Sequence, residues 1–223
     1  MGYVDVPVFV TCRDRVSDLR LLVDWLEKAG HQRIILLDND SGYEPLLEYY
    51  RQSPHAIYYL KHNYGSRALW HADLVPNEPF VLTDPDIVPL STCPHDLVGY
   101  LGEILDAYWL PKAGPSLYTG SLPEHCCKPN PLLEGMSIKE WEDSLISTSR
   151  ELGPGIYDSL IDTTFALYRS GSPFGFQAIR LGPPWQAKHL SWYRTSIDAE
   201  HAYYLSHATH GPEGTTWKPP ENT

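Results

Sequence analysis

Two carboxylates separated by one residue give the clearest chemical signal in this sequence. Asp84 and Asp86 follow the short apolar run of residues 80–82 and are held apart by Pro85. Hard oxygen ligands of this kind suit Mg²⁺ or Mn²⁺ that carries the phosphates of a substrate. Asp-Pro-Asp is also a common turn, so the motif gains weight only from what precedes it in the chain.

The first 90 residues alternate between apolar strands and helices. Strands are predicted at residues 6–10, 33–37, 56–60 and 80–83, with helices at 16–29, 45–52 and 66–72. In the first helix the apolar residues recur at helical spacing, and Gly30 stands where a C-cap glycine belongs. Continuous apolar strands that alternate with helices predict an α/β fold with a doubly wound, mostly parallel sheet.

The second half of the chain has a less regular pattern. Helices are predicted at 96–108, 138–151 and 198–207, and a strand at 160–168. Residues 111–136 hold many Pro and Gly residues, so we interpret them as a long loop and a candidate substrate lid. We expect a single domain over residues 1–210 and a flexible tail at 211–223.

Polar residues follow each of the four early strands, in the segments 11–15, 38–42, 62–67 and 84–86. A parallel sheet gathers the carboxyl ends of its strands along one edge, where open α/β sheets bind ligands. Arg13, Arg15 and Arg67 lie in these segments. In an acidic chain they fit diphosphate binding, although each is equally compatible with a surface ion pair.

The order and spacing of these segments resemble the GT-A fold of nucleotide-sugar-dependent glycosyltransferases of the family-2 type. The likeness covers residues 4–90 well and 155–195 loosely. It implies that residues 1–90 bind the nucleotide sugar and that 91–210 close the acceptor and metal side. By the resemblance, the nucleotide-binding residues are Thr11, Arg13, Asp38, Asn39, Asn63, Gly65, Arg67, Asp84 and Pro85, and the metal ligands are Asp84, Asp86 and His189.

The resemblance implies a glycosyltransferase of the hexosyltransferase type that depends on Mn²⁺ or Mg²⁺. Its donor is a nucleoside diphosphate sugar, with a UDP-sugar favoured, and its acceptor is a hydroxyl group on a glycan or small molecule. One alternative is a sugar-phosphate nucleotidyltransferase, which the absence of glycine from residues 11–15 disfavours. The other is a catalytically inactive GT-A domain that binds a ligand or partner. The sequence leaves the donor sugar, the acceptor and the stereochemical outcome open.

Asp162 is the candidate catalytic base, because it interrupts the predicted strand over 160–168. A carboxylate inside an apolar strand is unfavourable unless it is paired or used, and it can take the proton of an acceptor hydroxyl. The alternative is that Asp162 only bonds Thr163 and a backbone amide. Glu142 and Asp143 are a second place to seek the base.

His189 follows the Gly/Pro-rich bend at 182–184 and is interpreted as a third metal ligand, with a packed or surface histidine as the alternative. Because Asp86 follows a strand in a turn, we expect Asp86→Ala to abolish transfer while leaving the fold intact.

The composition limits the classes of partner. The chain has 28 acidic and 17 basic residues, a net charge of −11, which disfavours a sequence-independent nucleic-acid binder. It has no apolar run long enough for a transmembrane helix and no secretory signal, so we expect a cytoplasmic protein. The spacing of Cys12, Cys93, Cys126 and Cys127 fits neither a zinc site nor a redox pair, and we expect reduced thiols.

Overall fold

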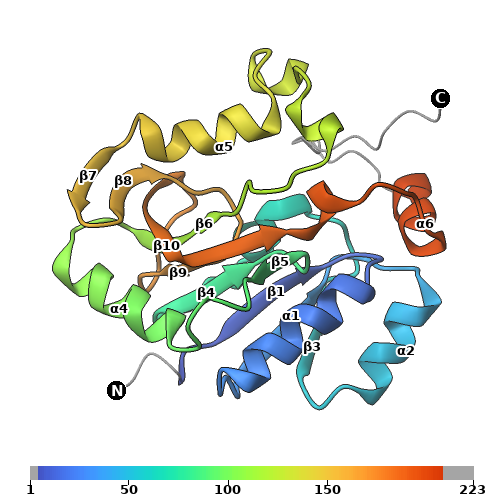
Figure 1. Ribbon diagram of the computed structural model, residues 1–223. Coiled ribbons are helices and arrows are strands. Elements are labelled where there is room, and N and C mark those ends of the chain that lie inside the picture. The colour runs from blue at the N-terminus through green and yellow to red at the C-terminus, as the bar shows by residue number, and fades with distance from the viewer. Residues whose placement is uncertain (1–4, 208–223) are drawn as a thin grey trace.

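A computed structural model describes residues 5–207 of the chain (Figure 1). The strands are β1 (Val8–Cys12), β2 (Ile34–Asp38), β3 (Ala56–Tyr59), β4 (Phe80–Thr83), β5 (Ile87–Pro89), β6 (Lys112–Leu117), β7 (Arg150–Gly153), β8 (Ile156–Leu160), β9 (Ala166–Tyr168) and β10 (Gln177–His189). The α-helices are α1 (Ser17–Lys28), α2 (Glu44–Gln52), α3 (Ala68–His71), α4 (Leu97–Ala107), α5 (Ile138–Ser147) and α6 (Ala199–His207). None of these helices is long and apolar enough to cross a membrane.

The strands of the described residues form one sheet in the order β3-β2-β1-β4-β9-β6-β10-β8-β7, and β5 pairs with β10 outside this order. Strands β1 to β4 are mutually parallel, and β6 is parallel to β10. Between these groups, β9 runs antiparallel to both β4 and β6. The predicted α/β class is therefore confirmed, with a parallel sheet in the first half and a mixed sheet in the second.

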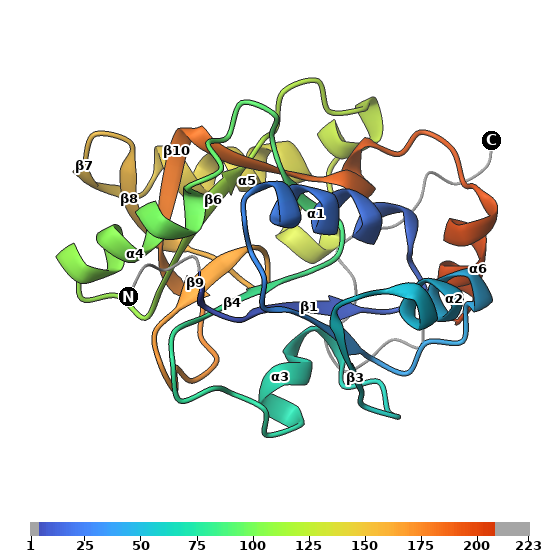
Figure 2. The same cartoon turned by 90° about the horizontal axis from the view of Figure 1, so that it is seen from below.

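Helices cover both faces of the parallel half, which explains its continuous apolar strands. Figure 2 shows α1 on one face and α3 on the other. Every residue of β1 and β4 is buried. The register sets Cys12 beside Asp38 at the carboxyl ends of β1 and β2, so the segments that follow these strands start side by side.

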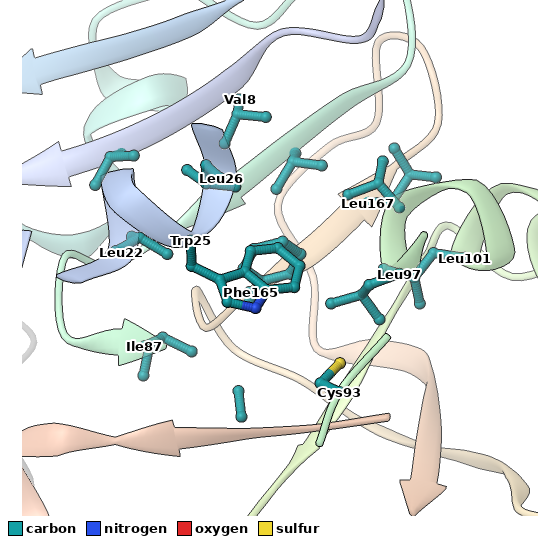
Figure 3. Close-up of a cluster of buried hydrophobic side chains, with 14 of the residues drawn as sticks. Val8, Leu22, Trp25, Leu26, Ile87, Cys93, Leu97, Leu101, Phe165 and Leu167 are labelled. Atoms are coloured by element: carbon teal, nitrogen blue, oxygen red, sulfur yellow. The ribbon is translucent and has the colours of Figure 1, made fainter. Parts of the chain in front are cut away.

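The larger part of the core lies between the sheet and the helices α1 and α4. Trp25 of α1 contacts the ring of Phe165 edge-on, with 6.3 Å between ring centroids (Figure 3). Leu22 and Leu26 lie one helical turn apart and are fully buried beside Val8. A second cluster fills the opposite face. The apolar periodicity of residues 16–29 thus predicted the packing face of α1 correctly.

The prediction of a loop over residues 111–136 was wrong at its start. Residues 112–117 form β6, whose six residues are all buried between β9 and β10. Its sequence, Lys-Ala-Gly-Pro-Ser-Leu, lacks the β-branched and aromatic residues that favour strands. Long-range pairing on both edges outweighs this weak local preference. Short 3₁₀ turns at 124–127 and 131–133 follow in the remaining segment.

Two other boundaries differ from the predictions. The predicted strand over 160–168 is two strands, because β8 ends at Leu160 and β9 begins at Ala166. The predicted helix over 138–151 ends at Ser147 and is followed by β7. The final helix is confirmed as α6, whereas the predicted tail at 211–223 lies outside the described residues.

Candidate functional site

The Asp84–Asp86 turn meets a segment that lies a hundred residues further along the chain. Strands β5 and β10 pair antiparallel with His189 opposite Ile87. Beyond the pair, the backbone N–H of Leu190 donates to the carbonyl oxygen of Asp86 at 2.8 Å. This register places the end of β10 directly against the acidic turn.

Asp86 is the centre of a buried polar network, and its side chain is only 1% exposed. Its Oδ2 accepts hydrogen bonds from Arg15 Nη1 at 2.7 Å and from the hydroxyl of Ser191, and His189 Nε2 lies 3.1 Å away. Burial raises the pKa of Asp86, but Arg15 and His189 outweigh this and hold it well below its usual range. Asp86 is therefore ionised at neutral pH.

The second oxygen of Asp86 has a different environment. Oδ1 is buried and has no hydrogen-bond partner within residues 5–207. A buried carboxylate oxygen without a donor is unfavourable in a folded protein, so this oxygen is available to accept a hydrogen bond from water or a ligand, or to coordinate a cation.

Asp84 differs from Asp86 because, among residues 5–207, no cationic side chain forms an ion pair with it. It is partly buried, and its Oδ2 accepts the hydroxyl of Thr163 at 3.3 Å. Burial, followed by the charges of Asp86 and Asp162, raises the pKa of Asp84 to about 7. One carboxylate of the pair is thus firmly ionised, and the other titrates near neutral pH.

His189 faces the acidic pair. Burial lowers the pKa of His189, but the adjacent Asp86 outweighs this and raises it. Its Nδ1 is buried and without a hydrogen-bond partner in the described chain. The ring also packs against Trp192, with 4.5 Å between centroids. His189 is therefore a packed histidine, and its position beside the Asp86 carboxylate is also the one that the ligand interpretation requires.

The fit of this cluster to a divalent cation is partial. Across residues 5–207, no group of three His, Cys, Asp or Glu side chains is close enough to hold a metal ion by itself. Mg²⁺, however, is commonly bound by one or two carboxylates together with waters and substrate phosphates. The donor chemistry of Asp84 and of Asp86 Oδ1 fits that kind of substrate-assisted site.

Asn39, the residue after β2, stabilises the segment that follows β3 at the same edge of the sheet. Asn39 Oδ1 accepts the backbone N–H of Tyr64 at 2.8 Å, and its Nδ2 donates to the carbonyl of Gly65 at 3.0 Å. Gly65 has φ +70°, a conformation that glycine adopts without strain, and Asn63 Oδ1 accepts its N–H. The side chains of Asn39 and Asn63 thus stabilise the conformation of residues 63–65 through hydrogen bonds to the backbone.

Asp38 is the last residue of β2 and is 4% exposed. Its Oδ1 accepts the hydroxyl of Tyr50 at 3.1 Å, and its Oδ2 accepts the backbone N–H of Ser41 at 3.4 Å. Burial raises the pKa of Asp38. Asp38 is thus held by Tyr50 and Ser41 at the end of β2.

Arg13 and Arg67, two of the arginines that fit diphosphate binding in the sequence, contact different parts of the structure. Arg13 donates to the carbonyl oxygens of Asn39 at 2.8 Å and His207 at 3.1 Å, so it joins β2 to α6. The guanidinium of Arg67 lies 4.1 Å from the ring centroid of Phe174. The hydroxyl of Thr11 is buried and has no hydrogen-bond partner among the described residues. Pro85 is buried between the two carboxylates.

Asp162 lies between two strands, so the prediction that it interrupts an apolar strand is wrong. It is exposed in the connection between β8 and β9, and its Oδ1 accepts the backbone N–H of Thr164 at 3.0 Å. The alternative of a local turn contact is thus present. Asp162 is nevertheless close enough to raise the pKa of Asp84.

The other base candidates are already engaged. Glu142 is buried and accepts Arg180 Nη1 at 2.6 Å, and Asp143 accepts the hydroxyl of Thr119 at 2.7 Å.

Helix α6 lies beside α2, beyond the carboxyl end of β1 (Figures 1 and 2). The ring of Tyr204 covers the guanidinium of Arg15 at 4.6 Å, and Tyr203 packs against Tyr43 at 5.0 Å. Glu200 Oε2 accepts the backbone N–H groups of Val16 at 3.0 Å and Ser17 at 3.1 Å. These bonds cap the start of α1, which has no cap from the residue preceding it.

His201 of α6 gives this packing a dependence on pH. It is 1% exposed, and burial, followed by Arg194 and Arg15, lowers its pKa to about 4. Since an unfolded histidine titrates near 6.5, the unfolded state binds more protons between pH 6.5 and 4. Stability is therefore lost as the pH falls through that window.

We expect His201→Gln to remove roughly 2–3 kcal/mol of the stability difference between pH 7 and pH 4.5. Urea unfolding of both proteins at the two pH values measures it. An unchanged difference would show that His201 is not the group that titrates.

Comparisons with known proteins add little to this geometry. No family model and no curated protein matches the chain. Among solved structures, the chain is similar to S. aureus TarS, with 13% sequence identity and a TM-score of 0.41. The match covers 74% of this chain and 28% of TarS, so the chain spans about a quarter of that protein's length. A likeness this distant carries no conclusion about activity.

Proposed function

We propose that this chain is a glycosyltransferase that uses a nucleoside diphosphate sugar as donor. The observation that supports it most is the buried Oδ1 of Asp86, which lacks a partner in the described chain and belongs to an ionised carboxylate. Asp84 and His189 lie beside it, at the edge of the sheet where open α/β folds bind ligands. Such an oxygen can accept a hydrogen bond or coordinate a cation, and a cation that carries the donor's phosphates would satisfy it.

The bound divalent cation, Mn²⁺ or Mg²⁺, would neutralise charge on the leaving diphosphate. Asp86 Oδ1 and Asp84 would hold it, and His189 would be a third ligand or would orient Asp86. Asp84 would also face the ribose. Asp38 would read the base. Uracil is the favoured base.

The acceptor would approach from the side of Asp162, because its carboxylate is exposed and the neighbouring Thr163 hydroxyl contacts Asp84 on the β8–β9 connection. If the enzyme inverts the sugar stereochemistry, Asp162 would take the proton of the acceptor hydroxyl. A retaining enzyme would not require such a base.

We expect a nucleoside diphosphate and a divalent metal to bind together. The acidic pair repels a bare diphosphate, so chelation should weaken binding by at least about tenfold, or 1.4 kcal/mol. Calorimetry with UDP and with GDP, in Mn²⁺ and after chelation, measures this. Asp24→Asn, on the exposed face of α1, is the matched control and should bind as the wild type does. Equal affinity after chelation would exclude the metal role.

A further inference from the structure

A buried lysine in the middle of the sheet has no assigned role in the proposed reaction. Lys112 is the first residue of β6, and it is 1% exposed. Its Nζ donates to the backbone carbonyl of Asp162 at 2.6 Å and to the hydroxyl of Tyr168 at 3.1 Å. Within residues 5–207 it forms no ion pair. Burying an ammonium without a carboxylate is unfavourable, so its position needs an explanation.

The contacts of Lys112 converge on the connection between β8 and β9, residues 161–165, here called the β8–β9 loop. The Tyr168 hydroxyl lies 3.1 Å from the same Asp162 carbonyl. At the start of the loop, Arg180 donates to the carbonyl of Leu160 at 2.8 and 3.1 Å, and it is 3% exposed. Two buried basic side chains therefore hold the carbonyl groups of Leu160, just before the loop, and of Asp162 within it.

The absence of a side chain at Gly114 leaves room for the β8–β9 loop to pass close to β6. A Cβ atom at Gly114 would lie 2.3 Å from the backbone oxygen of Phe165 and 2.9 Å from Ile161. Gly114 is two residues after Lys112, so both present the same face of β6 to the loop. The backbone of the loop thus crosses β6 at van der Waals distance, and Lys112 fixes it beside that crossing.

The loop connects this buried contact to the candidate site. Asp162 itself is exposed, and the hydroxyl of Thr163 lies 3.3 Å from Asp84 Oδ2. We propose that Lys112 is a positioning residue, which holds the Asp162 carbonyl so that the Asp162 carboxylate and the Thr163 hydroxyl are correctly placed beside Asp84. The catalytic part of this proposal rests on the proposed glycosyltransferase function, whereas the structural part does not.

The charges around Lys112 agree with this role. Burial lowers the pKa of Lys112 to about 7, Asp162 opposes that shift, and Arg180 adds to it. Tyr168 is the remaining titratable group in contact. Either protonation state of the amine keeps an N–H for the Asp162 carbonyl, so the contact persists on both sides of neutral pH.

Lys112→Met removes the hydrogen bond and retains a side chain of similar length. We expect amide hydrogen exchange to become faster in the peptide that spans residues 161–165, and sugar transfer to fall by about tenfold or more. The affinity for UDP with Mn²⁺ should fall by less than the transfer rate, because the loop meets the acidic pair through the Thr163 hydroxyl on Asp84, whereas Asp86 is held by Arg15. Lys28→Met, at an exposed position on α1, is the control and should change neither quantity.

A double-mutant cycle separates positioning from a general loss of stability. In an Asp162→Asn background, Lys112→Met should reduce the remaining rate by a clearly smaller factor than in the wild type, since one of the two groups it positions is already gone. An equal loss in both backgrounds, or unchanged exchange in residues 161–165, would overturn the proposal. If Lys112→Met does not fold, Tyr168→Phe tests the same carbonyl contact and keeps the ring stacked on Phe80.

Failure of the proposed function gives a different result. If no variant binds a nucleoside diphosphate, the glycosyltransferase assignment is wrong, and the exchange data still show whether Lys112 holds the β8–β9 loop.

Discussion

Asp86→Ala is expected to reduce sugar transfer to below a tenth of the wild-type rate, a loss of more than about 1.4 kcal/mol in transition-state stabilisation. The structure also changes the expectation for stability. Asp86 is buried against Arg15 and His189, so its removal leaves buried cationic groups without their carboxylate. Breaking a buried ion pair from one side costs about 3–5 kcal/mol. The fold should survive in a weakened form, as measured by urea unfolding.

The double variant Arg15→Met/Asp86→Ala distinguishes the two effects. It removes the unpaired guanidinium as well, so it should recover part of the lost stability while transfer stays absent. A single variant Asp86→Ala that retains more than a tenth of the rate would show that Asp86 does not hold the donor's cation. A double variant as unstable as the single one would show that Arg15 is not the group left uncompensated.

Asp84→Asn should have opposite effects on stability and on binding. The folded pKa of Asp84 is about 7, above the usual carboxyl value of 3.8, so the folded state binds more protons between these values. The stability that protonated Asp84 provides at low pH is lost as the pH rises to 7. At pH 8 the neutral amide should therefore stabilise the free protein, by an amount on the order of 2 kcal/mol.

The same substitution should weaken the joint binding of UDP and Mn²⁺ by at least about tenfold, because an amide is a poorer ligand than a carboxylate. Thermal unfolding without ligand and calorimetry with ligand, both at pH 8, give the two quantities. Thr163→Val serves as a control that removes the hydroxyl contact of Asp84 and keeps its charge. A variant that is destabilised at pH 8 and still binds normally would contradict both expectations.

The predictable part of this fold is the part with local signals. Strands β1, β2 and β4 have continuous apolar runs, and α1 has a clear apolar face, so their positions followed from residue order alone. Strand β6 has no such signal, because its place is set by pairing with β9 and β10. The break between β8 and β9 was missed for the same reason. The chain bends between β8 and β9, next to Gly114 of β6. This bend leaves no signal in the sequence of residues 160–168, which therefore resembles one strand.

The residues of the candidate site also differ in whether the sequence carries a local signal for them. Asp84 and Asp86 are adjacent in sequence, and their shared position at the end of β4 was evident from it. Ser191 and Thr163 gave no signal, because each meets its carboxylate only through contacts across the sheet. Arg15 was recognised as a cation near a strand end, but its buried pairing with Asp86 required β1 and β4 to be adjacent.

The capping of α1 by Glu200 has a consequence for synthesis of the chain on the ribosome. Strands β1 to β4 leave the ribosome early, but the first N–H groups of α1 receive their carboxylate only after residue 200 has emerged. The edge of β4 that pairs with β9 likewise stays unpaired until β9 has emerged. A nascent chain that stalls before residue 166 therefore exposes an unpaired apolar strand, a template for pairing with other chains. Such a chain would depend on chaperones until its second half has been translated.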